Sequence, residues 1–254
     1  SINQSLWPIL SYLLAILFLT ITIVLKWKPT FSCNYKEDHI TYAELLKVSL
    51  PLLLSQAMML VVGWTDQIML GDMASNADVG IYSAAFKLSL ITSIVIIAIN
   101  SIATPKFAEF YARGDVLGLE KMTKQSTKMI FWTTIPAFLA LLLFGPFLLG
   151  LYGEEFKIAY WALVLLLAGR FVGAIVGSVG YIMQMTGKQV AFQNILLVSA
   201  GTNILLNYFL IPEYGIYGAA FASMTSIIFQ NLTMMLYIKK TLGFYTIYLP
   251  ILSK

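Results

Sequence analysis

Apolar residues run in long stretches along this chain, and short polar segments separate the stretches. Seven of them reach the length of about 20 residues that a helix needs to cross the hydrocarbon of a bilayer. They are too long and too continuous for the alternating segments of about ten residues that build a membrane β-barrel. The pattern therefore predicts an all-α membrane protein with seven transmembrane helices, near residues 6–25, 47–70, 80–104, 128–150, 158–184, 190–211 and 215–238.

A polar linker at residues 26–44 divides these helices into one plus six. The division predicts a single helix at 1–25, which belongs to a preceding lobe, and a complete six-helix lobe at 45–242. The tail 243–254 is mildly apolar and too short to span, so we expect it to start a further helix. The chain begins at Ser1 without methionine, which suggests a fragment of a longer protein. Residues 7–25 lack the basic region and the cleavage site of a signal peptide, which favours a membrane span.

Composition supports the membrane assignment and excludes other classes. The 254 residues are 59% hydrophobic and 11% charged, whereas soluble domains have about 25% charged residues. The net charge of +4 does not indicate nucleic-acid binding, because the bases follow membrane topology. Of the 16 bases, 13 fall in connections on one side of the predicted membrane. By the positive-inside rule we expect Ser1 to lie outside and the tail to be cytoplasmic.

Three ionisable residues lie inside the predicted spans, where charge is costly and usually faces a bundle interior or a wet cavity. Asp66 and Lys87 descend from the same outer loop to similar depth, so we expect them to pair. One reading is a structural ion pair, and the other is contact with a charged substrate or a coupling ion.

Arg170 is placed near the middle of its span, and no carboxylate in the neighbouring spans can neutralise it except Asp66. Arginine stays charged, and its planar guanidinium suits phosphate. We therefore predict that Arg170 lines a cavity and binds an anion, with packing against helix-end carbonyls or Asp66 as the alternative. Gly169, Gly173 and Gly177 share a face of the same helix, which favours tight helix packing over a flexible hinge.

Amide side chains add polar atoms to the same lobe. Asn203 and Asn207 are four residues apart and share one helix face, and Gln56 lies in the first helix of the lobe. Bonding between helices is the simpler reading, and contact with sugar hydroxyls is the functional one.

No pattern for enzyme chemistry, a metal or a cofactor emerges from the sequence. His39 and Cys33 cannot build a zinc site alone. A phosphate-binding G-x-x-x-x-G-K-[ST] loop is absent as well. We therefore predict a protein that is not an enzyme and needs no cofactor.

Four stretches together resemble the multidrug/oligosaccharidyl-lipid/polysaccharide (MOP) exporter superfamily, and most closely its polysaccharide or O-antigen flippase branch. They are SLPLLLSQAMMLVVGWTDQIMLGDMASNADVGIYSAAFKL (49–88), ATPKFAEFYARGDVLGLEKMTKQS (103–126), GEEFKIAYWALVLLL (153–167) and NYFLIPEYGIYGAAFASMTS (207–226).

The resemblance implies two six-helix lobes around a central cavity and transport by alternating access. On that pattern residues 45–242 resemble the second lobe, and the first lobe would be a partner outside this chain. The implied substrate is an undecaprenyl-pyrophosphate oligosaccharide, with Arg170 and Lys87 at the pyrophosphate and Asn203, Asn207 and Gln56 at the sugar. Asp66 would act in gating or ion coupling.

Other readings of the same residues remain open. A cation-coupled multidrug exporter of the same superfamily would use Asp66 as its ion site. A peptidoglycan precursor flippase is closely related to the first reading. A scaffold without transport activity is a different class, and a membrane-embedded glycan enzyme would need a carboxylate pair near a membrane face.

Overall fold

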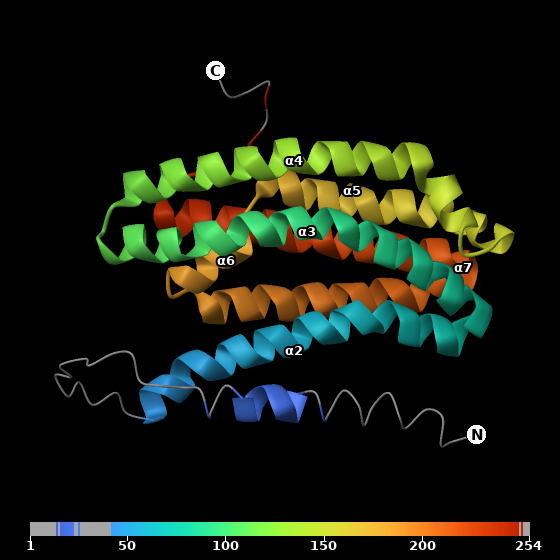
Figure 1. The fold of residues 1–254 in the computed structure, drawn as a ribbon, viewed down its shortest axis with the longest axis horizontal. Coiled ribbons are helices and arrows are strands. Elements are labelled where there is room, and N and C mark those ends of the chain that lie inside the picture. Colours follow the sequence, from blue (N-terminus) through green and yellow to red (C-terminus); the bar gives the residue numbers. More distant parts are fainter. Residues whose placement is uncertain (1–13, 15, 23–24, 26–41, 249, 251–254) are drawn as a thin grey trace. The chain divides into compact units, whose positions relative to one another are not determined.

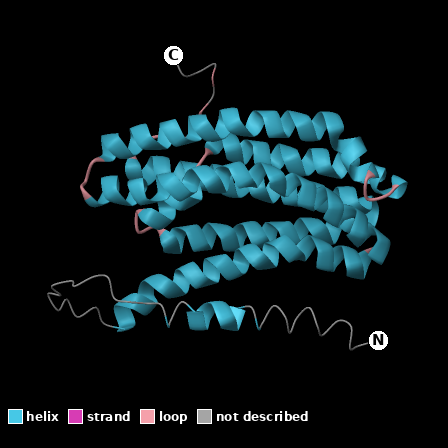
Figure 2. Ribbon diagram, in the orientation of Figure 1, coloured by secondary structure: helices cyan, strands magenta, loops and turns pink. Residues whose placement is uncertain are grey.

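The computed structural model describes residues 14, 16–22, 25, 42–248 and 250, and the chain divides into two compact units at Thr41 and Tyr42. Regular elements in these residues are all helical, which confirms the all-α prediction (Figure 2). Of the first predicted span, residues 14, 16–22 and 25 are described and helical. Most of the predicted linker 26–44 lies outside the described residues.

The second unit is an array of long, roughly parallel or antiparallel helices (Figure 1). Five helices in the described residues are long and apolar enough to cross a membrane. The elements are α2 (Tyr42–Met73), α3 (Asn76–Ala112), α4 (Val116–Gly150), the 3₁₀ helix η1 (Glu154–Ala159), α5 (Tyr160–Val176), α6 (Val179–Met185) and α7 (Gln189–Leu242).

Helix α7 contains two of the predicted spans. Its 54 residues include Gly215, which has a non-helical φ of 53° and ψ of −127°. Gly215 divides α7 into a first arm, 189–214, and a second arm, 216–242. The arms fold back on each other tightly, since a Cβ at Gly218 would clash with the carbonyl oxygen of Leu210. With α7 counted as two arms, the second unit has six long helical segments. Apart from α5, they reach or extend beyond the predicted boundaries, because hydropathy detects only the part of a helix that suits hydrocarbon.

The predicted span 158–184 is not one helix, because it is broken between α5 and α6 (Figure 1). Gly177 ends α5 with a φ of 83° and a ψ of −143°. A Cβ at Gly177 would also clash with the side chain of Thr127, so the position favours glycine twice over. The prediction missed this break because glycines at four-residue spacing also indicate packing.

The segment after α7 covers the break. The amide of Tyr248 donates to the carbonyl of Ile175 at 3.0 Å, and the break is what leaves that carbonyl accessible. The Tyr248 ring packs edge-on against Phe131, with centroids 5.6 Å apart, and Trp132 Nε1 donates to the Tyr248 hydroxyl at 3.3 Å. A backbone group within a membrane needs an internal partner, and the tail supplies one here.

The remaining glycines of the predicted packing face behave as expected. A Cβ at Gly169 would lie 3.0 Å from the Cα of Met224 in the second arm of α7. A Cβ at Gly173 would meet the amide of Asn231 at 3.5 Å. These small residues let α5 approach α7 closely, and the two helices form one of the most extensive contacts in the unit.

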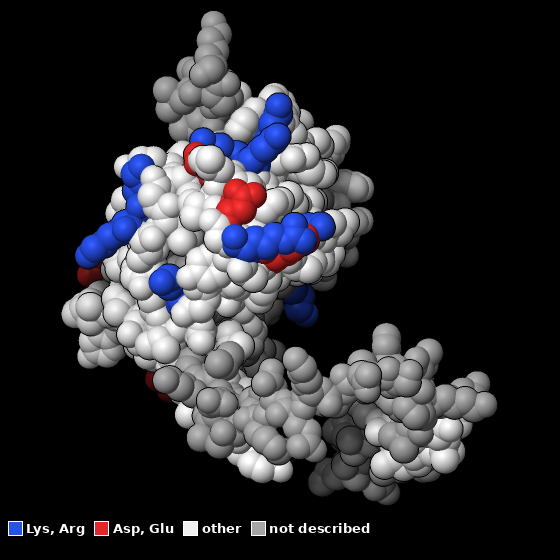
Figure 3. Space-filling view, turned by 90° about the vertical axis from the view of Figure 1, so that its left-hand side faces the viewer, with Lys and Arg blue, Asp and Glu red and all other residues white. Residues whose placement is uncertain are grey.

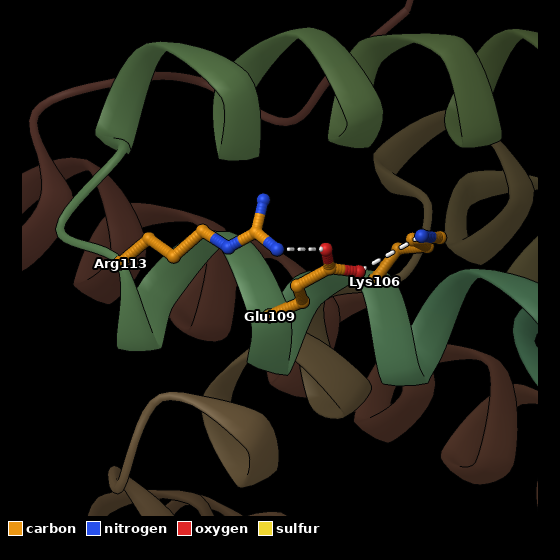
Figure 4. A network of polar contacts seen from close by, with 3 residues as sticks. All are labelled: Lys106, Glu109 and Arg113. Carbon is orange, nitrogen blue, oxygen red and sulfur yellow. Dashed lines mark hydrogen bonds and ion pairs between the residues drawn. The ribbon is translucent and has the colours of Figure 1, made fainter.

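Basic residues gather at one end of the helices, where α3 meets α4, where α6 meets α7 and where α7 ends (Figure 3). At this end Glu109 bonds to both Lys106 and Arg113 at 2.8 Å (Figure 4). Asp115 caps α4 by accepting from the Gly118 amide at 2.7 Å. The opposite end, with the α2–α3 turn, η1 and Gly215, has Lys157 as its one base in the described residues.

Replacing Gly177 by alanine tests whether the break is a built feature. Alanine at a positive φ, with its Cβ against Thr127, should cost about 1–3 kcal/mol and lower the thermal unfolding midpoint. Gly201→Ala is the matched control, because Gly201 is helical and a Cβ there would have no atom within 4 Å. Equal midpoints for the two variants in detergent would contradict the assignment.

Candidate functional site

A buried carboxylate joins four helical segments in the interior of the second unit. Asp66 of α2 is 1% exposed. Tyr82 of α3 donates its hydroxyl to Asp66 Oδ2 at 2.5 Å, and the hydroxyl of Ser223, in the second arm of α7, donates to the same oxygen. Asn203 and Asn207, in the first arm of α7, donate their side-chain amides to Asp66 Oδ1 at 3.1 and 2.7 Å.

These four donors fit an ionised carboxylate. Two carboxylate oxygens offer about four lone-pair positions, and here two donors reach each oxygen. The donors are neutral, so they stabilise the charge without adding a base. A buried charge that is fully hydrogen-bonded in this way holds its surrounding helices in one arrangement.

The expected pair between Asp66 and Lys87 does not form, because Lys87 is exposed and Tyr82 occupies the place beside the carboxylate. Five residues separate Tyr82 from Lys87, which turns their side chains about 140° apart around α3. The prediction chose the wrong face of α3 and a position more than one turn too far along it. Lys87 has no ion pair with any carboxylate in the part of the chain that the structure describes.

Arg170 lies near the middle of α5, about 15 Å along the helix from its first residue. Its Nε and Nη1 donate to the hydroxyls of Ser89 and Ser93 at 2.9 Å each. Its guanidinium lies 5.5 Å from the centre of the Phe86 ring. These three partners all come from α3, so Arg170 fixes α5 against α3.

No carboxylate among the described residues forms an ion pair with Arg170. Two of its five N–H donors are used in the bonds to Ser89 and Ser93. The residue as a whole is of intermediate exposure, and its other three N–H donors have no partner that the structure records. Arg170 is thus held by neutral groups alone among the described residues.

One face of α3 serves both charges. Tyr82, Phe86, Ser89 and Ser93 recur at spacings that place them on a single helix side. Tyr82 stacks on Phe86 with ring centroids 6.2 Å apart, so the contacts lead from Asp66 through two rings to Arg170. The sequence prediction missed all four residues, although their shared face was a signal that could have found them.

The other residues predicted for the site separate into two groups. Asn203 and Asn207 are 0% exposed and bond to Asp66, so in this structure they hold the carboxylate and do not face a sugar. That outcome is the simpler of their two readings, which is bonding between helices. Gln56 is exposed on α2, and no hydrogen bond of its side chain is recorded among the described residues.

Solved structures identify the class of fold. A MATE crystallised in complex with MaL6 matches with a TM-score of 0.66 at 16% identity, over 80% of this chain and 48% of that chain. A MOP superfamily transporter from Pyrococcus furiosus matches with a TM-score of 0.66 at 20% identity, over 83% and 48%. At such identities the likeness concerns the fold alone: half of a MATE-type transporter.

Similar sequences point to proteins of polysaccharide biosynthesis within this class of transporter fold. The family described as "Polysaccharide biosynthesis protein" matches residues 6–111. The probable low-salt glycan biosynthesis flippase Agl15 of Haloferax volcanii is 26% identical over 164 residues, which cover 64% of this chain and 35% of that protein. The capsular polysaccharide biosynthesis protein CapF of Staphylococcus aureus is 24% identical over 225 residues, or 82% and 55%.

These matches and the fold confirm the resemblance to the polysaccharide flippase branch of the MOP superfamily. The chain is a multi-pass membrane protein that is similar over part of its length to proteins named for glycan flipping and polysaccharide biosynthesis, and in fold to half of a MATE-type transporter. It spans about a third to a half of the length of the curated relatives that it matches.

Removing the Asp66 carboxylate tests its structural weight. Asp66→Ala leaves four buried donors without their acceptor, which should cost about 3 kcal/mol and lower the thermal unfolding midpoint. Asp72→Ala, an exposed acid on the same helix, is the control and should leave the midpoint unchanged. An equal effect of both substitutions would show that the hydrogen-bonded cluster does not stabilise the fold.

Proposed function

We propose that this chain is the second lobe of a transporter that moves a lipid-linked oligosaccharide across the bacterial cytoplasmic membrane, by alternating access against a first lobe. The substrate class is an undecaprenyl-pyrophosphate oligosaccharide used in surface polysaccharide synthesis, such as O-antigen of lipopolysaccharide. The named relatives, a glycan biosynthesis flippase and a capsular polysaccharide protein, support this substrate class.

The observation that carries the proposal is that Arg170 has no acid partner among the described residues. Serine hydroxyls orient its guanidinium from one side, and no acid among the described residues neutralises it. A pyrophosphate is a compact anion that accepts bidentate hydrogen bonds from arginine. Lys87, which is exposed two residues before Ser89 on α3, would add a second positive charge at a nearby depth.

The end-to-end charge difference supports an orientation. The end that carries the α3–α4 and α6–α7 connections holds most of the described bases, so it faces the cytoplasm in this proposal. The end with Gly215 and the α2–α3 turn then faces outward. Ser1 would lie outside and the tail of α7 inside.

Asp66 has a separate role in the proposal, as the site that couples transport to an ion or proton. It is the one acid in the interior of the described helices, and its donors come from α3 and from both arms of α7. Protonation or a bound cation would displace donors from the carboxylate and so loosen α2 from α7. Gln56 remains a candidate for sugar contact, whereas Asn203 and Asn207 belong to the coupling cluster.

Surface glycan measured in cells with the complete transporter tests the role of Arg170. We expect Arg170→Ala to reduce exported glycan by about tenfold or more at equal protein level, because the pyrophosphate loses its counter-charge. Arg170→Lys should retain part of the activity, since charge remains but the planar fork is lost. Lys157→Ala is the control. It removes a base in η1, away from Arg170, and should export normally. Normal export by Arg170→Ala would remove Arg170 from the mechanism.

The alternative is a cation-coupled multidrug exporter, which the structural likeness to MATE proteins keeps in view. Asp66→Asn distinguishes the two when drug susceptibility and surface glycan are measured in the same strain. The proposal expects glycan export to fall and drug susceptibility to stay unchanged. A strain that becomes drug-sensitive while exporting glycan normally would favour the drug reading. A loss of peptidoglycan precursor translocation with intact surface polysaccharide would indicate the precursor flippase.

A further inference from the structure

A groove of about 290 Å³ lies between α3 and α4, near their basic ends. Ala98, Ile99 and Ile102 of α3 and Met122, Gln125 and Met129 of α4 are among its lining residues. The lining is almost wholly apolar. Ile102 is 74% exposed and Met129 52% exposed, so the groove opens on the outside of the helices.

The groove is separate from the polar interior. On α3 the side chains of Tyr82 and Asn100 face inward and are 0% exposed, whereas Ile102, two residues beyond Asn100, points outward. The groove shares no residue with the contacts of Asp66 or Arg170. Its volume is at the small end of ligand pockets, which suits a segment of one hydrocarbon chain. The two methionines can adapt their shape to a flexible occupant.

Charge adjoins the groove at one end. Lys106 lies four residues beyond Ile102, on the same side of α3, and Arg113 lies two turns further on (Figure 4). Both bases share the single acid Glu109, at 2.8 Å each, so the triad has one positive charge in excess. Lys121 follows on α4 and has no ion pair with any acid in the described residues. Residues 105–128 carry five bases and three acids.

We propose that this groove binds one anionic phospholipid, with an acyl chain between α3 and α4 and its phosphate beside Lys106 and Arg113. The α3 lining and Met129 fall within the predicted spans 80–104 and 128–150, whereas Met122 and Gln125 lie just beyond the second span, so the groove sits where the two helices approach the headgroups. Basic residues at such a position attract anionic lipids of the leaflet that they face. The partial neutralisation of Lys106 and Arg113 by one shared carboxylate leaves each with N–H donors for a phosphate oxygen.

The site would fix the α3–α4 pair to the bilayer. The Phe110 ring lies against Gly118, 2.6 Å from where a Cβ of that glycine would be, so the two helices meet directly beyond the groove. An acyl chain in the groove would therefore fill a gap between two helices that are in direct contact at Phe110 and Gly118. This inference concerns lipid binding and does not depend on the substrate proposed above.

Trp132 provides a probe, because it lies three residues beyond Met129 on α4 and is 53% exposed. The complete protein, with Trp132 as its only tryptophan, is reconstituted with phospholipids brominated in the acyl chain, which quench nearby indole fluorescence. We expect brominated phosphatidylglycerol to quench Trp132 at roughly tenfold lower mole fraction than brominated phosphatidylcholine. Lys106→Gln with Arg113→Gln should abolish that preference, and the control Lys157→Gln should not.

A second pair of variants tests whether a lipid acyl chain occupies the groove. Ala98→Phe fills the groove without altering charge and should reduce quenching by both lipids, whereas Ile94→Phe, one turn away and not lining the groove, should not. Equal quenching by the two headgroups, or a preference that persists without Lys106 and Arg113, would overturn the proposal. Displacement of the quencher by a polyprenyl pyrophosphate but not by unbrominated phosphatidylglycerol would overturn it too, by assigning the groove to a prenyl chain.

Discussion

The arrangement of the second unit depends on the hydrogen bonds that surround one buried carboxylate. Asp66 cannot remain charged in an apolar interior without donors, and the chain supplies them from α3 and from both arms of α7. Each donor is a neutral side chain, which costs less to bury than a charged partner would. The carboxylate therefore brings together helices that would otherwise have only close packing to select their register.

Helix α3 connects this carboxylate with the single interior arginine of the described residues. Its inward face presents a phenol to Asp66, then a ring and two hydroxyls to Arg170. Opposite charges are thus kept apart by a neutral layer rather than joined in an ion pair. An ion pair would cancel both charges. The observed separation leaves Arg170 without an acid partner among the described residues and Asp66 held by neutral donors alone.

The sequence was sufficient to predict the long helices, because bilayer thickness imposes a length and a polarity that few other structures share. It also singled out Asp66 and Arg170, since charge within apolar runs is rare. It could not assign their partners. Tyr82, Ser89, Ser93 and Ser223 are common types of residue in membrane helices, and only the rotation of each helix decides which of them faces a charge. The exchange of Tyr82 for Lys87 as the partner of Asp66 came from that rotation.

The break between α5 and α6 has a consequence for biogenesis. Membrane helices enter the bilayer in the order of synthesis, yet the carbonyl of Ile175 receives its partner from Tyr248, which follows the whole of α7. Until that tail is synthesised, the carbonyl of Ile175 lacks the partner that it has in the folded lobe, so folding of the lobe is incomplete. A ribosome that stalls or a gene truncated before residue 248 would leave an inserted but unfinished bundle, open to quality-control proteases.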